Sequence, residues 1–220
     1  MKSIGSQISR EDYIKVQIRA SQRKFKYCKV SSRCVSRFRE ILKDISGPVI
    51  CLGTRNGREV DLFRIVFFKG RLRNFLLRFL EIRKNGYTGR IKWFERFDKS
   101  NKGCICKQSV IGVEINPQGE RKDVVCASFD ELSNEWDEKF NILYANTLDH
   151  AQYPEATYEK WRRLVRPGGY YIVSFADIKA DNVGCSGDFT LDDILKFFPG
   201  ELIYYNKFGN WYQDVIIKKG

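Results

Sequence analysis

After residue 48 the chain alternates short, continuous apolar runs with turns that carry glycine, proline or asparagine. A run of this kind predicts a strand buried on both faces, as in a parallel sheet covered by helices. Segments with apolar residues three or four apart predict helices between the strands. Five strands of this type are expected to begin near residues 49, 110, 123, 140 and 170. The pattern therefore indicates an α/β fold.

A helix is expected to begin at Ser9, before the first predicted strand. Ser9 suits an N-cap, and the acids Glu11 and Asp12 favour the positive end of a helix. Its apolar face is predicted from three positions at helical spacing, Tyr13, Val16 and Ala20. We expect this face to pack on the sheet.

Two more helices and a hairpin complete the predicted elements. Helical spacing of apolar residues recurs over 35–42, and a helix is expected from residue 58 to about 68. At the other end of the chain, two strands over 201–205 and 211–217 flank a turn, which predicts a β-hairpin.

The first strand runs into a turn that carries Gly53 and Gly57, and the second strand ends in Glu114. A glycine lets the backbone approach a ligand closely, and a carboxylate at the next strand tip can accept hydrogen bonds from ribose hydroxyls. A strand, glycine turn and helix followed by such an acid is typical of α/β sheets that bind the adenosine of a cofactor. A nicotinamide-binding domain is disfavoured because the complete Gly-x-Gly-x-x-Gly turn is missing.

Two later motifs make this interpretation more specific. Leu148-Asp149-His150 follows the fourth predicted strand, and Arg163-Leu-Val-Arg-Pro-Gly-Gly169 precedes the fifth. In this order, over about residues 48–175, the chain resembles the class I S-adenosylmethionine (SAM)-dependent methyltransferases, in particular the type 11-like group. The resemblance implies a Rossmann-like sheet with helices on both faces and a C-terminal antiparallel hairpin, in a single domain over 1–220.

The resemblance also implies a cofactor, SAM, with S-adenosylhomocysteine as its product. Residues 1–47 would form N-terminal helices that cover the site, with Tyr13 and Lys15 as candidate contacts of this lid. The residues expected to bind the cofactor are Gly53, Thr54, Arg55, Asn56, Gly57, Glu114, Ile115, Ser128, Phe129 and Asn146.

The chain departs from the family pattern at three of its motif positions. Cys51 stands where an acid commonly organises the glycine loop, and Arg55 replaces a glycine that adopts left-handed dihedrals more easily. Arg55 has two interpretations: its guanidinium pairs with the SAM carboxylate, or it points to solvent. Ser128 replaces an aspartate that often binds the adenine amino group, and a hydroxyl accepts that hydrogen bond more weakly.

His150, the only histidine in the chain, is the candidate general base, since it follows the fourth strand at the rim where ligands bind. A base is needed because a sugar hydroxyl does not ionise at neutral pH. Asp149 would orient His150 or act as the base itself. No metal ion is expected, although Asp177 and Asp181 together with Asp149 are a weaker alternative as cation ligands. Cys104-x-Cys106 has no second ligand pair at zinc spacing.

The motifs that mark base-modifying and ribose 2′-O enzymes are absent, so the favoured acceptor is a hydroxyl of a small molecule or glycan. The Cys-Leu-Gly-Thr-Arg-Asn-Gly57 turn resembles glycan-modifying methyltransferases, including domains that large DNA viruses attach to glycosyltransferases. An RNA methyltransferase and a non-catalytic module with this fold stay open as alternatives.

Charge distinguishes the two halves of the chain, whose net charge is +12. Residues 1–107 hold 27 basic and 9 acidic side chains, whereas residues 108–220 hold 12 and 18. Much of the excess lies in 69–107, a basic insertion with 12 basic and three acidic residues that also includes a predicted short strand over 90–97. The positive charge of this half attracts anions, such as a phosphate-bearing acceptor or nucleic acid. The insertion could also contact a neighbouring domain of a longer polypeptide.

No apolar run is long enough to span a membrane, and the N-terminus lacks the core of a signal peptide. The seven cysteines are scattered rather than arranged as a disulfide framework, and Cys51 and Cys126 fall in predicted core strands. A reducing, cytoplasmic location is therefore expected.

Overall fold

The computed structural model describes residues 8–25, 28, 30–43, 45–68, 105, 109–175, 189–208 and 212–220. All but one residue of the basic insertion 69–107, including the predicted strand over 90–97, lies outside the described residues, as do Asp177, Asp181 and Cys104-x-Cys106.

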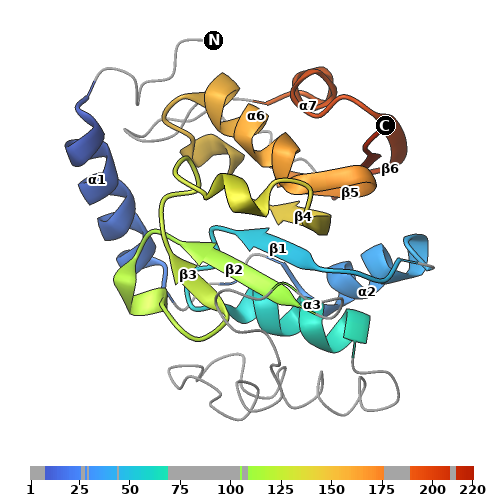
Figure 1. Cartoon of the computed structure of the whole chain (residues 1–220), viewed down its shortest axis with the longest axis horizontal. Coiled ribbons are helices and arrows are strands. Elements are labelled where there is room, and N and C mark those ends of the chain that lie inside the picture. Colours follow the sequence, from blue (N-terminus) through green and yellow to red (C-terminus); the bar gives the residue numbers. More distant parts are fainter. Residues whose placement is uncertain are drawn as a thin grey trace.

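Seven strands pair in one sheet (Figure 1). Their bounds are β1 Val49–Leu52, β2 Val110–Glu114, β3 Val124–Cys126, β4 Phe140–Ala145, β5 Val165–Phe175, β6 Glu201–Phe208 and β7 Tyr212–Lys218. The order is β3-β2-β1-β4-β5-β7-β6, with β1 to β5 parallel and β7 antiparallel to both β5 and β6. The predicted parallel strands and the C-terminal hairpin are thereby confirmed.

Helices cover both faces of the sheet (Figure 1). The α-helices are α1 Arg10–Arg23, α2 Ser32–Ile41, α3 Arg58–Phe68, α6 Pro154–Leu164 and α7 Leu191–Phe197, and short 3₁₀ turns are η3 Pro117–Gly119, η4 Asn134–Trp136 and η5 Leu148–His150. Helices α2 and α3 pack on one face, where the rings of Phe63 and Tyr144 lie 4.8 Å apart. Helices α6 and α7 pack on the other, around the fully buried Trp161.

Strand β5 begins earlier than the sequence pattern predicts. The Pro-Gly-Gly segment, expected as a turn before the strand, lies inside it as an irregularity at which Gly168 has a φ of +70°. The Gly168 amide donates to the Lys219 carbonyl, and the Lys219 amide donates to the Gly169 carbonyl. These bonds extend the sheet across the glycines and attach the C-terminal segment to β5.

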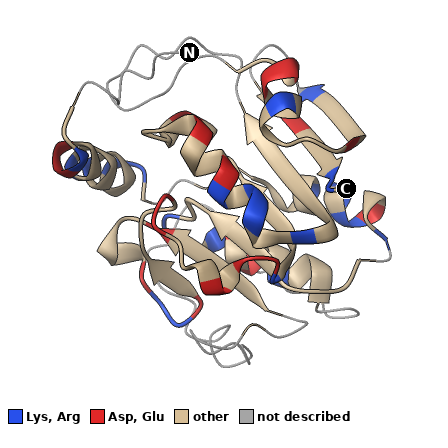
Figure 2. Cartoon of the chain, turned by 45° about the horizontal axis from the view of Figure 1, so that its top comes forward, with Lys and Arg blue, Asp and Glu red and all other residues tan. Residues whose placement is uncertain are grey.

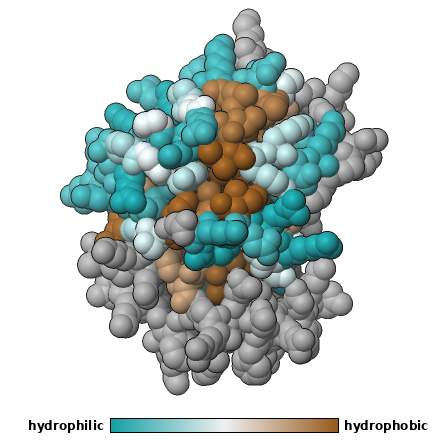
Figure 3. Space-filling model, turned by 90° about the vertical axis from the view of Figure 1, so that its right-hand side faces the viewer, coloured by the Kyte–Doolittle hydropathy of each residue, from teal (hydrophilic) through white to brown (hydrophobic). Residues whose placement is uncertain are grey.

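Strand β6 forms one edge of the sheet and exposes the apolar side chains of Leu202 and Ile203. Figure 3 views the side of the molecule on which β6 lies and shows apolar side chains gathered in a band. The pairing of β6 with β7 shifts register between Leu202 and Tyr204. A bulge of this kind twists an edge strand and discourages its pairing with a further strand.

Both signs of charge occur along the described helices (Figure 2). Most of the charged side chains are exposed, as in the Glu11–Lys15 pair on α1. Four others form a buried network between α3 and the segment before β3. Arg121 contacts Asp61 at 2.6 Å and Asp123 at 2.5 Å, and Arg64 contacts Asp123 at 2.6 Å. Two cations and two anions therefore balance in this buried network and hold α3 against β2 and β3.

Another buried acid, Glu59, lies in the first turn of α3, beneath the glycine turn. It is 1% exposed, and neither carboxyl oxygen accepts a hydrogen bond of ordinary geometry from the described residues. Burial raises the pKa of Glu59 to about 7, although the charge of Arg55 and the thiol of Cys28 act in the opposite direction. Glu59 is thus neutral in the folded protein at pH values well below 7, where an ordinary glutamate is already ionised.

We predict that Asp61→Ala lowers the free energy of unfolding by about 3–5 kcal/mol, because Arg121 and Arg64 are then left with one buried carboxylate. Urea-induced unfolding of both proteins measures the difference. Glu11→Ala is the matched control: it removes an exposed partner of Lys15 and should change little. A loss below about 1 kcal/mol for Asp61→Ala would contradict a structural role for the network.

A second prediction concerns the pH dependence of stability and follows from the raised pKa of Glu59. The ordinary pKa of 4.5 rises to about 7 on folding, so the contribution of Glu59 to stability is complete below pH 4.5 and is lost as the pH rises through 7. The loss is about 3 kcal/mol for a shift of this size. Glu59→Gln should therefore unfold at higher urea than wild type at about pH 8, with the gap closing toward about pH 4.5.

The control for this comparison is Glu40→Gln, at an exposed position of α2. Glu40→Gln should follow the pH dependence of wild type. If Glu59→Gln also follows the wild-type curve, burial of the Glu59 carboxyl does not shift its pKa.

Candidate functional site

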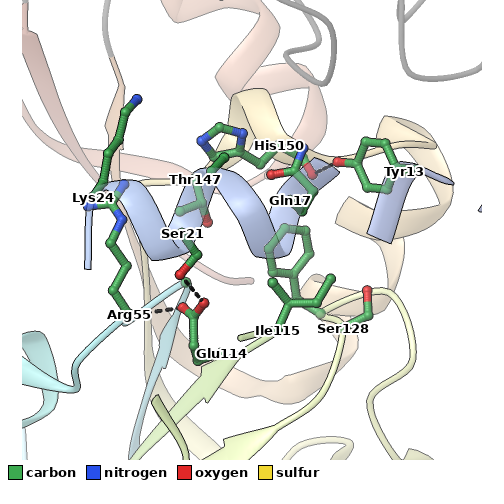
Figure 4. Close-up of a pocket in the computed structure, with 13 residues that line it drawn as sticks. Tyr13, Gln17, Ser21, Lys24, Arg55, Glu114, Ile115, Ser128, Thr147 and His150 are labelled. Atoms are coloured by element: carbon green, nitrogen blue, oxygen red, sulfur yellow. Dashed lines mark hydrogen bonds between the residues drawn. The ribbon is translucent and has the colours of Figure 1, made fainter. Parts of the chain in front are cut away.

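A pocket lies at the carboxyl ends of β1, β2 and β4, and α1 crosses over it (Figure 4). The parallel strands end at the same edge of the sheet, so residues far apart in sequence meet there. The lining residues are Tyr13, Gln17, Ala20, Ser21 and Lys24 of α1 and the segment after it, with Gly53, Arg55, Glu114, Ile115, Ser128, Phe129, Thr147 and His150 from the strand ends.

Glu114, the last residue of β2, is the acidic centre of this pocket. It is 2% exposed, and its carboxylate accepts three hydrogen bonds, of which Figure 4 draws those from Arg55 and Ser21. Oε2 accepts from the Arg55 amide at 2.6 Å, and Oε1 accepts from the Asn116 amide at 3.1 Å and the Ser21 hydroxyl at 2.7 Å. Hydrogen bonds to an ionised carboxylate offset the cost of burying its charge. Glu114 therefore joins the glycine turn, its own strand end and α1.

The glycine turn after β1 has an unusual backbone. Arg55 has a φ of +49°, which is left-handed and unfavourable for a residue with a side chain, and Gly53 has a φ of +73°. The conformation directs the Arg55 amide at Glu114. On the other side of the turn, a Cβ added to Gly119 would lie 2.1 Å from the Arg55 carbonyl oxygen, so only glycine fits there. Arg55 thus keeps its backbone conformation through contacts on both sides.

The buried face of helix α1 differs from the face that its apolar residues predict. Ser9 caps it as expected, by accepting from the Asp12 amide. The buried positions are Tyr13, Gln17 and Ser21, whereas Val16 and Ala20 are only half-buried. The buried face was therefore mispredicted except at Tyr13, because α1 lies over the pocket and buries Gln17 and Ser21 instead of packing on the sheet.

Two residues were expected as contacts of the lid, and their outcomes differ. Tyr13 lines the pocket, and its hydroxyl donates to the His150 carbonyl. Lys15 is exposed and pairs with Glu11, so it does not line the pocket. The tyrosine attaches α1 to the turn after β4, which carries the candidate base.

The structure brings seven of the predicted site residues into the pocket: Gly53, Arg55, Glu114, Ile115, Ser128, Phe129 and His150. The other five, Thr54, Asn56, Gly57, Asn146 and Asp149, do not line it. The Asn56 side chain accepts from the Arg58 amide at the start of α3, and Gly57 faces Arg121. Both serve the local structure of the turn.

Asn146 and Asp149 flank the pocket on the segment after β4. Asn146 is 7% exposed, and its amide oxygen and nitrogen have no hydrogen-bond partner among the described residues. Asp149 is 44% exposed, with an oxygen 3.8 Å from His150 Nε2. Thr147, the neighbour of Asn146, lines the pocket, and the assignment of Asn146 to cofactor binding stays a prediction.

Besides Ala20, which was expected to pack on the sheet, four lining residues were not anticipated: Gln17, Ser21, Lys24 and Thr147. The first three follow Tyr13 at intervals of four, four and three residues, which is the spacing of one helix face. A polar stripe at this spacing is the pattern that would have identified them.

Two negative findings hold for the described part of the chain. No group of three or more His, Cys, Asp or Glu side chains is placed to hold a metal ion there. No described helix is long and apolar enough to cross a membrane.

Cys51 is buried as predicted, whereas Cys126 is only half-buried because β3 is an edge strand.

No protein-family model matches the chain, and no curated protein matches its sequence. Solved structures do match. The 1,6-didemethyltoxoflavin-N1-methyltransferase of Burkholderia thailandensis, with bound 1,6-didemethyltoxoflavin and S-adenosylhomocysteine, has a TM-score of 0.61 and 14% identity over 96% of this chain and 91% of that chain. A SAM-dependent methyltransferase of Aquifex aeolicus has a TM-score of 0.50 and 10% identity over 87% and 100%.

A third match, the [4+2]-cyclase SpnF, has a TM-score of 0.53 and 11% identity over 87% of this chain and 83% of that chain. One fold thus carries more than one kind of reaction, as is usual for widespread folds. Strand order, the antiparallel β7 and these neighbours agree: the chain has the Rossmann-like α/β fold of the class I SAM-dependent methyltransferases.

Proposed function

We propose that this protein binds SAM in the pocket under α1 and transfers its methyl group to a hydroxyl of a small-molecule or glycan acceptor. The observation that carries the proposal is the buried Glu114 carboxylate at the end of β2, beside the glycine turn. A carboxylate in this place suits the two hydroxyls of a ribose. The B. thailandensis neighbour, which is crystallised with S-adenosylhomocysteine, supports the choice of cofactor.

The remaining pocket residues suit the other parts of SAM. Ile115 and Phe129 supply apolar surface for the adenine ring, and Ser128 supplies an oxygen for its amino group. At the opposite side of Glu114, Gly53 lets the cofactor approach the backbone closely. The Arg55 side chain supplies a cation for the carboxylate of the methionine part. Asn146 nearby carries an amide that lacks a partner among the described residues and would be satisfied by a polar ligand group.

When bound, SAM supplies an activated methyl group, and the protein must align the acceptor and remove its proton. His150 lines the pocket and is 20% exposed, so it can reach both cofactor and acceptor. It would take the hydroxyl proton as the methyl group is transferred. The Asp149 carboxylate, 3.8 Å from Nε2, would stabilise the imidazolium that forms.

Charge in the pocket favours an anionic acceptor. Lys24 and Arg55 are both lining residues, and Glu114 is the single acid among them. A phosphate-bearing sugar combines the hydroxyl and the negative charge that this arrangement would accept. The RNA alternative depends on the insertion 69–107, nearly all of which lies outside the described residues.

We predict that the wild-type protein binds S-adenosylhomocysteine saturably in a calorimetric titration. Glu114→Ala and the isosteric Glu114→Gln should weaken binding by about 30- to 300-fold, the value of one or two hydrogen bonds to a charged group. Glu120→Ala, at an exposed acid six residues along, is the control and should bind as wild type does. Absence of binding to the folded wild-type protein would overturn the proposal.

The second prediction concerns the transfer step. With tritiated SAM and a panel of nucleotide sugars, phenols and RNA, we expect transfer to a hydroxyl acceptor. His150→Gln should lower kcat by about 10²–10⁴-fold, because a general base is lost, while S-adenosylhomocysteine binds nearly unchanged. Transfer to RNA alone, with steep salt dependence, would favour the RNA alternative. Binding without transfer to any acceptor would favour a non-catalytic module.

A further inference from the structure

The N-terminal end of helix α1 is fixed to the wall of the pocket by several contacts. Arg10, its first residue, donates from both terminal nitrogens to four side chains that follow β3 and β4, at distances of 2.6–3.3 Å: Asp130, Gln152, Ser128 and Glu131. One turn along the helix, the Tyr13 hydroxyl donates to the His150 carbonyl. Two of the Arg10 partners are carboxylates, and hydrogen bonds between opposite charges are the stronger kind.

The C-terminal end of α1 reaches the pocket through Ser21, which points at Glu114 (Figure 4). The Ser21 hydroxyl donates to Glu114 Oε1 at 2.7 Å, and the Ser21 oxygen lies at the 3.5 Å limit from the side-chain amide of Asn116. Ser21 is 9% exposed and Glu114 is 2% exposed. This end of the helix is therefore held on the same carboxylate that the proposed function assigns to the ribose.

Glu114 cannot keep all of its internal donors and also accept two ribose hydroxyls. A carboxylate has about four acceptor positions, and three are used by the Arg55 amide, the Asn116 amide and the Ser21 hydroxyl. Two ribose hydroxyls need two positions, so one internal donor must leave. The two amides belong to the backbone of the glycine turn and of the segment after β2, whereas Ser21 is a side chain on a covering helix. Ser21 is therefore the donor that gives way.

We infer that Ser21 is an internal competitor for the cofactor, which holds the C-terminal half of α1 on Glu114 until a ribose hydroxyl displaces it, while Arg10 keeps the N-terminal end in place. The inference rests on the proposed function. The bond to Ser21 must break for the ribose to bind, which lowers the apparent affinity for any ligand that uses Glu114. Because the Arg10 end has more and stronger hydrogen bonds, the helix pivots about that end instead of detaching.

The first test removes the competing hydroxyl. In a calorimetric titration, Ser21→Ala should bind S-adenosylhomocysteine about 3- to 30-fold more tightly than wild type, because no internal hydrogen bond to a charged group has to be broken. Ser21→Thr keeps a hydroxyl and should bind about as wild type does. Gln22→Ala, at the next and exposed position of the helix, is the matched control and should also leave the affinity unchanged.

The second test loosens the other end of the helix. Arg10→Met should weaken binding of S-adenosylhomocysteine by about threefold or more, because α1 loses the contacts that keep Tyr13 and Gln17 against the pocket. Substitutions at the two ends of one helix are thus expected to change the affinity in opposite directions. Tighter binding by Arg10→Met would mean that the whole helix competes with the cofactor, and would overturn the pivot.

The remaining outcomes separate this inference from the proposed function. Unchanged or weaker binding by folded Ser21→Ala would overturn the role of Ser21 while leaving cofactor binding intact. Binding by Ser21→Thr that is as tight as that of Ser21→Ala would also overturn it, since the hydroxyl would then have no effect. Failure of folded wild type to bind S-adenosylhomocysteine would overturn the proposed function and this inference together.

Discussion

The buried carboxylate of Glu114 is the interaction on which the site depends. A charge that is 2% exposed is tolerated only where donors surround it, and here these come from three separate segments. The amide of Arg55 is one of them, and it faces Glu114 only because Arg55 adopts a left-handed backbone. Strain of this kind persists where the surroundings over-determine it, and such places are often functional. The acid therefore shapes the glycine turn before any ligand binds.

The Glu114 carboxylate also holds helix α1, through the hydrogen bond that it accepts from Ser21. Its hydroxyl donates to Glu114 as a ribose hydroxyl would, so α1 occupies part of the place proposed for the cofactor. Helix α1 is attached mainly through polar contacts of this type, from Arg10, Tyr13 and Ser21 to the walls of the pocket. Elements with little apolar burial open at low cost in free energy. Cofactor binding as proposed therefore requires the loss of the hydrogen bond from Ser21 of α1 to Glu114.

Much of the fold is predictable from the sequence because parallel strands buried on both faces are continuous apolar runs. Val49–Leu52 and Phe140–Ala145 are clear for this reason, and Glu114 stands out as a charge at the end of such a run. The face of α1 was mispredicted because apolar periodicity assumes that a helix packs on the core, whereas the face of α1 that carries Gln17 lies over the pocket. The cofactor-binding role of Asn146 stays a prediction: Thr147 and His150 supply the pocket lining after β4, since the direction of a side chain after a strand depends on the backbone of the turn.

The most direct test of the account is a crystal structure of the protein with S-adenosylhomocysteine. The account predicts that both ribose hydroxyls lie on the Glu114 carboxylate, with the adenine between Ile115 and Phe129 and the Ser21 hydroxyl displaced from Glu114. A ligand bound elsewhere, or in this pocket with Glu114 still bonded only to Ser21, Asn116 and Arg55, would contradict it.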